Sequence, residues 1–330
     1  MRALVTGAGG FLGGAIARAL LAQGHAVVAL QRGDAPALRA LGAVVCRGDL
    51  GDANAVSAAA AGCDVVFHVA AKAGHWGTLA EYRRANVDGT AHVLAACRQH
   101  GIGRLVYTST PSVVHSGGDL EGVDERVPYA TRFLAHYPAT KAIAEQLVLA
   151  ANGPTLATVA LRPHLIWGPG DNHLYPRIVE RARAGRLRFI GKPGKRIDTT
   201  YIDNAVDAHL LAAATLAPGA PQAGRAYFIS NGEPLTTEDM INRMLACAGL
   251  PPVQARTPFA LAYAVGALME AAWTVLPLPG EPLMTRFVAD HLATAHWYDI
   301  SAARRDFGYA PRVSMDEGFR RLAAHSGKSD

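Results

Sequence analysis

The residues of this chain best suited to chemistry are a tyrosine and a lysine four positions apart, Tyr137 and Lys141. Side chains at positions i and i+4 share one face of a helix, so the Lys141 ammonium can lie beside the Tyr137 phenol. A nearby cation lowers the pKa of a phenol from roughly 10, which suits it to exchange protons near neutral pH. With five lysines against 10 tyrosines, chance gives about 0.15 such pairs. From these two residues alone, a pair on a helix surface remains the alternative.

A glycine-rich turn near the start of the chain provides the context for that pair. Gly7, Gly10 and Gly13 follow an apolar run at residues 3–5 and precede a helical pattern. Strand, tight turn and helix in this order open a dinucleotide-binding βαβ unit. Glycines let the backbone approach a pyrophosphate, to which the helix N-terminus offers unpaired N–H groups. The segment predicts cofactor contacts at Gly7, Gly10, Phe11, Leu12 and Gly13.

Length and composition favour one large enzyme. The chain has 330 residues, of which 50% are hydrophobic, and its net charge is +5 without a basic run that would suit nucleic acid. Its four cysteines are far apart and its 13 histidines form no HExxH or HxH motif, so we expect neither disulfides nor a metal. Because the first expected strand begins at residue 2, we expect no signal peptide and a cytoplasmic protein.

Apolar runs alternate with alanine-rich helical stretches along the first half of the chain. This alternation predicts an α/β fold with a Rossmann-type, doubly wound parallel sheet covered on both faces. We place a dinucleotide-binding domain at residues 1–163 and a smaller C-terminal substrate lobe at 164–330, with segments near 187–230 partly returning to the sheet. The expected strands are 3–6, 26–30, 43–47, 65–69, 105–108 and 158–162, and the expected helices include 13–23, 53–61, 87–100 and 137–151.

Several motifs in their order and spacing resemble those of the extended short-chain dehydrogenases/reductases, and most closely their 3β-hydroxysteroid-dehydrogenase-like branch. The resemblance covers essentially the whole chain. Four further segments are similar to members of this branch that reduce 2-alkyl-3-oxoalkanoic acids in bacterial long-chain olefin biosynthesis. They are His75-Trp76-Gly77, Thr110-Pro111-Ser112-Val113, Leu165-Ile166-Trp167 and residues 198–203. The family motifs are the glycine-rich turn, Gly48-Asp49-Leu50, His68-Val69-Ala70-Ala71, Asn86-Val87-Asp88-Gly89-Thr90, Tyr107-Thr108-Ser109-Thr110, Tyr137/Lys141, residues 162–170 and residues 305–311.

The resemblance implies the roles of the catalytic residues. Tyr137 would exchange the proton while hydride moves between the carbonyl carbon and the nicotinamide. Lys141 would bind the nicotinamide ribose and keep the phenol acidic, and Thr110 would polarise the carbonyl, with Ser109 as the alternative hydroxyl. Two hydroxyl groups on one oxygen stabilise the negative charge that develops there.

Cofactor choice depends on the end of the second expected strand, where Gln31 and Arg32 stand. NAD-preferring proteins of this fold place a carboxylate there to bind the ribose 2′-OH. An arginine facing a 2′-phosphate instead makes a charge-assisted hydrogen bond of roughly 1.5–3 kcal/mol. Asp34 follows, and we interpret it as a solvated loop residue. The sequence therefore predicts NADPH over NAD.

The resemblance also implies further contacts. Asp49 and Leu50 would frame the adenine, and Asn86 would either support the active site or begin a helix, as asparagine often does. Histidines and tryptophans in loops after strands are candidate pocket residues, because open α/β sheets bind ligands at that edge. Remaining cofactor candidates are Ala70, Ala71, Lys72, Pro163 and Leu165; substrate candidates are His75, Trp76, His115, His164 and Trp167, one of which could pair with a substrate carboxylate.

Residues 258–279 are unusually apolar and are interrupted by Glu270. A membrane span needs roughly 20 uninterrupted apolar residues, so we expect a core helix, a wall of a substrate pocket, or a surface that contacts a membrane or a pathway enzyme. This apolar segment and the lack of a basic cluster favour an apolar keto-acid substrate. The sequence is also compatible with a homodimer.

We therefore expect an NADPH-dependent reductase that converts the 3-keto group of a long-chain 2-alkyl-3-oxoalkanoic acid to the 3-hydroxyl. A 3β-hydroxysteroid dehydrogenase and a nucleotide-sugar epimerase of the same fold are the alternatives. The Pro111-Ser112 pair after Thr110 disfavours a dehydratase, which carries acidic residues there. The retained Tyr137/Lys141 pair disfavours a non-catalytic dinucleotide sensor.

Overall fold

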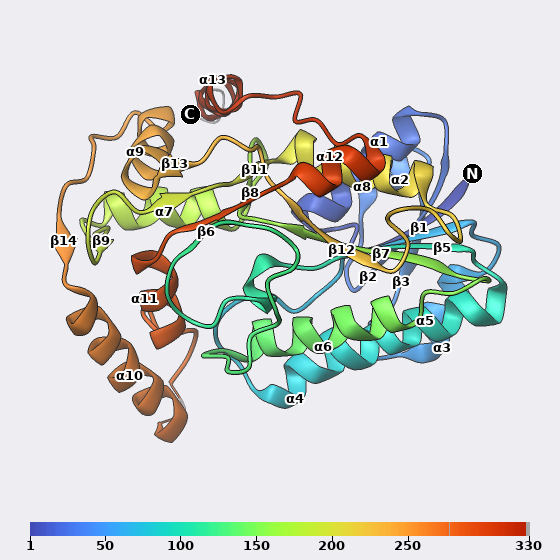
Figure 1. Ribbon diagram of the computed structural model, residues 1–330, viewed down its shortest axis with the longest axis horizontal. Helices are drawn as coiled ribbons and strands as arrows, with labels where there is room; N and C mark the ends of the chain where they lie inside the picture. Colours follow the sequence, from blue (N-terminus) through green and yellow to red (C-terminus); the bar gives the residue numbers. More distant parts are fainter. Residues whose placement is uncertain (277, 328–330) are drawn as a thin grey trace.

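A seven-stranded sheet lies at the centre of the protein (Figure 1), in the order β12-β7-β5-β4-β1-β2-β3. The structure is a computed structural model that describes residues 1–276 and 278–327. All six neighbouring pairs of strands are parallel, which confirms the predicted doubly wound sheet. The strands are β1 (Arg2–Thr6), β2 (Ala26–Gln31), β3 (Val44–Arg47), β4 (Val65–His68), β5 (Arg104–Thr108), β7 (Ala157–Pro163) and β12 (Arg225–Ile229).

Helices cover both faces of this sheet, so its strands are apolar on both sides. Successive side chains of a strand point to opposite faces. Accordingly, Leu4 packs in the core beneath Val93 and Leu94, whereas Val5 packs in the core with Ile16 on the other face. Figure 1 shows α3 (Ala53–Ala60), α5 (Gly89–His100) and α6 (His136–Ala150) on one face and α1 (Phe11–Ala22), α8 (Ile202–Thr215) and α12 (Ser301–Phe307) on the other.

The remaining C-terminal elements gather at one end of the sheet (Figure 1). They include a small sheet in the order β13-β10-β15-β6. Of the segments expected to return to the main sheet, β12 does so, whereas β9 (Phe189–Ile190) pairs with β14 (Arg256–Thr257). The domain boundary at residue 163 stays a prediction. The other elements here are β6 (Leu120–Val123), β10 (Arg196–Ile197), β13 (Leu235–Thr236), β15 (His296–Tyr298), α7 (Leu174–Arg183), α9 (Thr237–Cys247), α10 (Phe259–Val275), α11 (Arg286–Ala293) and α13 (Met315–Ser326).

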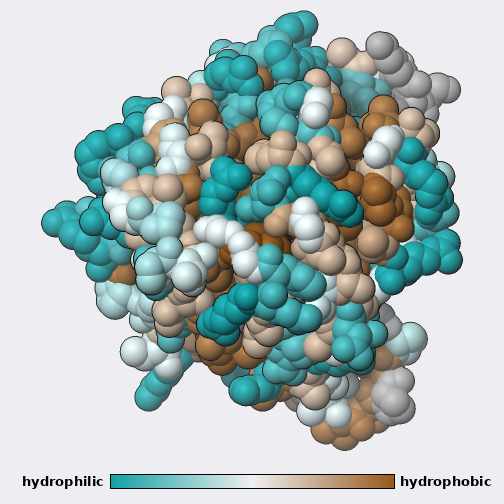
Figure 2. Space-filling model, turned by 90° about the vertical axis from the view of Figure 1, so that its right-hand side faces the viewer, coloured by the Kyte–Doolittle hydropathy of each residue, from teal (hydrophilic) through white to brown (hydrophobic). Residues whose placement is uncertain are grey.

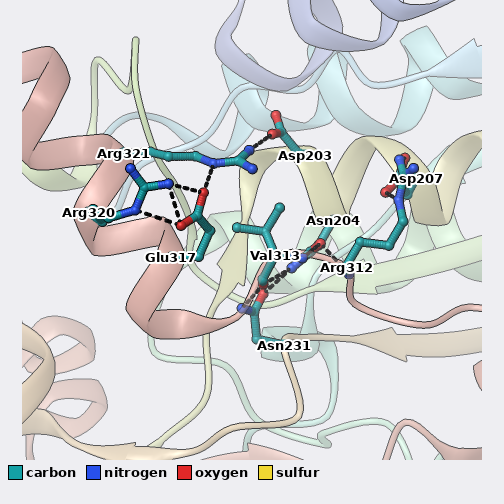
Figure 3. Close-up of polar contacts among 9 residues, drawn as sticks. All are labelled: Asp203, Asn204, Asp207, Asn231, Arg312, Val313, Glu317, Arg320 and Arg321. Atoms are coloured by element: carbon teal, nitrogen blue, oxygen red, sulfur yellow. Dashed lines mark hydrogen bonds and ion pairs between the residues drawn. The ribbon is translucent and has the colours of Figure 1, made fainter.

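Two asparagines fasten the segment before α13 to the main sheet (Figure 3). The Asn204 amide donates to the Val313 carbonyl at 2.7 Å, and the Asn204 oxygen accepts from the Val313 N–H at 3.0 Å. Asn231, after β12, donates to the same carbonyl at 3.0 Å. An ion pair between Arg312 and Asp207 adds to this connection. The segment before the C-terminal helix is thereby held against α8.

Helix α10 lies at the surface of the protein and is not part of the hydrophobic core. Its buried residues are Ala262 and Gly266, while Leu261 and Leu268 are exposed. A Cβ on Gly266 would lie 2.6 Å from the Thr285 backbone, so glycine is needed where α11 approaches. The end of α10 is the lowest part of the molecule in Figure 1, and the corresponding projection is hydrophobic in Figure 2. The core-helix alternative for residues 258–279 is therefore wrong.

Among the residues that the structure describes, none of the helices has the length and apolar character needed to cross a bilayer.

Candidate active site

The strand order reverses between β1 and β4, and in sheets of this kind ligands bind outside the carboxyl ends of the strands at such a point. A buried histidine joins the two ends. His68 bonds to the Thr6 hydroxyl through Nδ1 and to the Thr90 hydroxyl through Nε2, both at 2.9 Å. Burial lowers the pKa of His68 to about 3, so the ring is neutral. His68 therefore fixes the sheet edge on which the site is built.

The glycine-rich turn has the geometry that a dinucleotide pyrophosphate requires. Gly7 has φ +69°, and a Cβ there would lie 2.9 Å from the Ala70 Cα. A Cβ on Gly13 would lie 2.3 Å from the Gly7 carbonyl oxygen, so both positions need glycine. Helix α1 begins at Phe11 after Gly10, which offers no side-chain cap. The first N–H groups of α1 are thus available to an anion, and this cradle fits a nicotinamide dinucleotide.

The end of β2 presents a cation next to this turn. Arg32 is exposed and makes no ion pair with any residue in the described part of the chain. Asp34 is instead engaged by Arg39 at 2.7 Å and Arg47 at 3.6 Å. The hydrogen bonds from Arg39 and from the Ala35 N–H hold the pKa of Asp34 below its ordinary value. Asp34 is an exposed loop residue, as the sequence predicts, and it is also paired with two arginines.

The predicted adenine residues lie in the turn between β3 and α3. The Asp49 carboxylate accepts from the Gly51 N–H at 2.8 Å. The Leu50 carbonyl accepts a hydrogen bond from His92 Nδ1 at 2.7 Å. The Leu50 side chain packs against Gly89, where an added Cβ would lie only 2.7 Å from the Leu50 Cβ. Their contact with an adenine stays a prediction.

Asn86 holds the segment that follows β4. It lies inside the π-helix Arg83–Asp88, a helix type that is frequent at functional sites. Its oxygen accepts from the Lys72 N–H at 2.7 Å, and its amide donates to the Lys72 carbonyl at 3.1 Å and the Thr140 hydroxyl at 3.0 Å. The helix-start alternative for Asn86 is wrong, since the residue supports the backbone beside Ala71 and the helix that carries Lys141.

Thr110, Tyr137 and Lys141, the predicted catalytic residues, lie at the carboxyl end of β5 and on the facing helix α6. The Thr110 hydroxyl is close enough to the Tyr137 phenol to lower its pKa, and it donates a hydrogen bond to the Ser112 hydroxyl at 3.2 Å. The Lys141 ammonium donates to the Thr108 carbonyl at 2.6 Å and lies 4.1 Å from the centre of the Tyr107 ring. Tyr137 and Thr110 thus form the hydroxyl pair that the sequence predicts.

The pKa values of this group differ from the expectation. Burial raises the pKa of Tyr137 to about 12, and the Thr110 hydrogen bond only partly offsets that effect. Burial also lowers the pKa of Lys141 to about 7, opposed by the charge of Glu145. The prediction that the ammonium makes this phenol acidic is therefore wrong for the protein alone, because desolvation raises the pKa of Tyr137 and Lys141 is not among the groups that lower it.

Ser109 was the alternative to Thr110. The backbone N–H of Ser109 donates to the Leu161 carbonyl at 2.6 Å, which anchors it to β7. Its hydroxyl is buried and has no hydrogen-bond partner among the residues that the structure describes. The contact with Tyr137 thus favours Thr110 as the polarising hydroxyl.

A buried ion pair supports α6 one turn beyond Lys141. Arg162, on β7, meets Glu145 at 2.6 Å, and the Tyr129 hydroxyl donates to the same carboxylate at 2.6 Å. The Glu145 side chain is fully buried. Breaking such a pair leaves an uncompensated buried charge, so it fixes the position of α6 against the sheet.

The predicted nicotinamide residues follow β7. Pro163 ends that strand opposite Ile229. Leu165 has φ +40°, an uncommon conformation for a bulky side chain. Strain of this kind clusters at ligand sites and persists only where the surroundings enforce it. The conformation therefore marks this turn as a candidate binding segment.

The predicted substrate residues are divided among different places. His75 contacts the Pro282 carbonyl through Nε2 at 3.2 Å, and Tyr82 donates to the Trp76 carbonyl at 3.2 Å. Trp167 is fully buried, bonds to the Thr199 hydroxyl at 2.9 Å and packs on Phe319. The substrate assignment of Trp167 is therefore wrong, since the residue belongs to the core.

His115 and His164 join two histidines that the sequence analysis missed. His291, on α11, and His296, on β15, complete what we call the histidine cluster (His115, His164, His291 and His296), with neighbouring ring centres 4.2–6.2 Å apart. Burial and mutual repulsion hold the pKa values of His291 and His296 well below the ordinary range. No short motif could have revealed the cluster, because His115 and His164 are distant in the sequence from each other and from the His291/His296 pair.

Comparison with known proteins agrees with this geometry. The model of the 3-beta hydroxysteroid dehydrogenase/isomerase family matches residues 4–260. The chain belongs to this family. It is thus an NAD(P)-dependent oxidoreductase, as its glycine turn and Tyr137/Lys141 pair indicate.

Three relatives illustrate the range of the similarity. A 2-alkyl-3-oxoalkanoate reductase of Stenotrophomonas maltophilia is 57% identical over 99% of this chain and 99% of its own length. A protein of the same name from Shewanella oneidensis is 53% identical over 98% of this chain and 85% of its length. The crystal structure of UDP-glucose 4-epimerase from Thermus thermophilus, in complex with NAD, matches both chains in full with 26% identity and a TM-score of 0.75.

Proposed function

We propose that the protein is an NADPH-dependent reductase of long-chain 2-alkyl-3-oxoalkanoic acids. The Thr110–Tyr137 hydroxyl pair, beside buried Lys141, carries this proposal, because it can hold and protonate one ketone oxygen. Two relatives that bear this enzyme name, at 57% and 53% identity over nearly the whole chain, support the substrate class.

The chain's own residues account for the proton and for the charge on oxygen. A bound nicotinamide supplies the hydride that reaches C3 of the substrate. As negative charge develops on the ketone oxygen, the hydroxyls of Thr110 and Tyr137 stabilise it. Tyr137 then gives its proton to that oxygen, so the ketone becomes a secondary alcohol. Lys141 lies one turn along α6 and, with a pKa of about 7, can hold or release a proton in the neutral range.

Arg32 supports the preference for NADPH. It is exposed at the end of β2, and the carboxylate of Asp34, two residues further along, is paired with Arg39 and Arg47. An unengaged guanidinium beside the glycine turn suits a ribose 2′-phosphate. We expect Arg32→Ala to lower kcat/KM for NADPH by about 10–100-fold and to change that for NADH little. Arg183→Ala, which removes an exposed arginine from the end of α7, is the control. Equal losses with both cofactors would contradict the role of Arg32.

A side-by-side assay tests the substrate. NADPH oxidation is measured with a 2-alkyl-3-oxoalkanoate, a 3-ketosteroid and a UDP-sugar at equal concentrations. We expect turnover with the keto acid at least about 100-fold above the other two, since only the keto acid combines an apolar chain with a ketone beside a carboxylate. Turnover of the steroid alone would instead favour a 3β-hydroxysteroid dehydrogenase, a name carried by a relative from Mycolicibacterium neoaurum at 35% identity.

Other expectations from the sequence stay predictions. They are a cytoplasmic location, a homodimer, and contact of the exposed apolar side of α10 with a membrane or a pathway enzyme.

A further inference from the structure

The histidine cluster brings four imidazoles together in the interior, and none of them takes part in the proposed proton transfer. His115 follows the short helix Pro111–Val113, His164 follows β7, and the other two lie on α11 and β15. His115, His164 and His296 are 94–99% buried, as their exposed fractions are 6%, 3% and 1%. One ring nitrogen from each of His115, His291 and His296 lies within 4.8 Å of the others.

Two carboxylates determine which nitrogen of their histidines carries the proton. His115 Nε2 lies 2.7 Å from Asp290, and His164 Nδ1 lies 2.8 Å from Asp198. An ionised carboxylate only accepts hydrogen bonds, so these nitrogens are the donors. In the neutral form of each ring, the opposite nitrogens, His115 Nδ1 and His164 Nε2, carry lone pairs. Both are buried without a hydrogen-bond partner in the described chain.

The Thr294 hydroxyl likewise determines which nitrogen of His296 carries the proton. Thr294 donates its single proton to the Asp290 carbonyl at 2.8 Å. It must therefore accept from His296 Nε2, which lies 2.8 Å away. The lone pair of His296 is then on Nδ1. The Nδ1 atom of His291 is likewise buried and, among the described residues, without a partner.

We propose that His115, His291 and His296 bind a divalent late first-row transition metal ion, of which Zn²⁺ is the reference case. Neutral imidazoles are preferred ligands of such ions. A carboxylate that orients a histidine whose other nitrogen binds metal is the usual outer arrangement, and Asp290 occupies that position toward His115. Zn–N bonds of about 2.0–2.1 Å would draw the three nitrogens together by a modest rotation of their rings.

The same geometry disfavours a substrate carboxylate as the occupant. An anion needs donors, whereas the unpaired nitrogens of His115 and His296 carry lone pairs. Asp290 and Asp198 also bring negative charge to the cluster. Access to a cation is available, because Asp290 lines an open cavity of about 630 Å³. A bound ion would join the loop after β5 to α11 and β15, and so fix the C-terminal elements beside the sheet edge.

The test uses full-length, tag-free protein treated with EDTA and then dialysed. Zn²⁺ titration should give one ion per chain and raise Tm by a few degrees. Co²⁺ should give the visible absorption bands of a nitrogen-ligated site. His291→Asn should abolish this stoichiometric binding, and Asp290→Asn should weaken it by about 10–100-fold. His173→Asn, which changes an exposed histidine outside the cluster, should bind as the wild type does.

The wild-type titration alone can overturn the proposal, so it does not depend on whether a variant folds. Wild-type protein that takes up no Zn²⁺ or Co²⁺ at one equivalent would refute it. Binding retained in His291→Asn would also refute it, since the ion would then lie elsewhere. If octanoate, and not Zn²⁺, raises the Tm of the wild type and fails to do so for His291→Asn, the cluster is a carboxylate site. None of these readouts requires the proposed reductase activity.

Discussion

Two groups of buried polar side chains flank the carboxyl ends of β5 and β7, and they differ in how the fold satisfies them. In the catalytic group of Thr110, Tyr137 and Lys141, the Thr110 hydroxyl bonds to the Ser112 hydroxyl beside the phenol, and the ammonium bonds to the Thr108 carbonyl. In the histidine cluster, ring nitrogens of His115, His164 and His291 lie buried with no partner in the described part of the chain.

This difference separates a site that the fold completes by itself from one that it leaves incomplete. A buried polar atom without a hydrogen bond costs roughly 1–3 kcal/mol. Native proteins contain few such atoms, and each calls for an explanation such as a ligand or a catalytic role. The catalytic group needs no ligand to be stable. The unpaired ring nitrogens of the histidine cluster, in contrast, acquire a partner only when a ligand binds.

The largest effect should come from removing the phenol in the catalytic group. We expect Tyr137→Phe to reduce kcat by about 10²–10⁴-fold, because the substrate oxygen loses its proton donor. Cofactor affinity should change less than about twofold, since the cradle is built from the glycine turn. Steady-state kinetics and titration of NADPH fluorescence measure the two quantities. Turnover near that of the wild type would remove Tyr137 from the mechanism.

The ion pair behind α6 should have the next largest effect, on stability. Glu145→Gln keeps the shape but leaves Arg162 buried without a counter-charge, so we expect a loss of about 3–5 kcal/mol in the free energy of unfolding. The matched control is Glu317→Gln, because Glu317 pairs with Arg320 and Arg321 at the surface. Its expected loss is about 1 kcal/mol or less. Denaturant unfolding of both variants measures the two losses in the free energy of unfolding. Equal losses would mean that burial does not strengthen the ion pair between Glu145 and Arg162.

Lys141 should make stability depend on pH in a predictable direction. Its pKa is about 7 in the folded protein and about 10.4 when unfolded. Between these values the unfolded chain binds more protons, so the contribution of Lys141 to stability rises with pH. The free energy of unfolding of the wild type, minus that of Lys141→Met, should therefore increase by about 1–3 kcal/mol from pH 7 to pH 9. A constant difference would show that Lys141 keeps its proton.

The catalytic side of this comparison could be predicted from the sequence because its signals are local. The glycine turn is encoded within seven residues, and Tyr137 and Lys141 within one helical turn. Continuous apolar runs likewise located the strands of the main sheet. Thr110 needed the family resemblance, because a hydroxyl after a strand is common in any protein.

The histidine cluster and the pKa values of the catalytic group could not be predicted from the sequence, for two physical reasons. His115 and His164 meet the His291/His296 pair only through long-range packing, which spacing along the chain does not record. The pKa values of Tyr137 and Lys141 depend on how deeply the final fold buries them, so the i, i+4 pattern placed both residues on α6 but predicted the wrong direction for the pKa of the phenol. Trp167 was misassigned for a related reason, since a tryptophan after a strand can face the core or a pocket.

The smallest expected effect tests the incompleteness of the histidine cluster directly. His291→Phe removes a ring whose Nδ1 is unpaired and that stacks on Phe287, so an apolar ring should fit with little penalty. In EDTA, we expect the free energy of unfolding to change by less than about 1 kcal/mol. His68→Phe is the matched control, because both nitrogens of His68 are bonded. Its loss leaves the proton of the Thr6 hydroxyl without its acceptor, at a cost of about 1–3 kcal/mol, while Thr90 keeps its bond to the Asn86 carbonyl. If both variants lose the same stability in metal-free buffer, His291 has a partner within the fold and the contrast between the two groups fails.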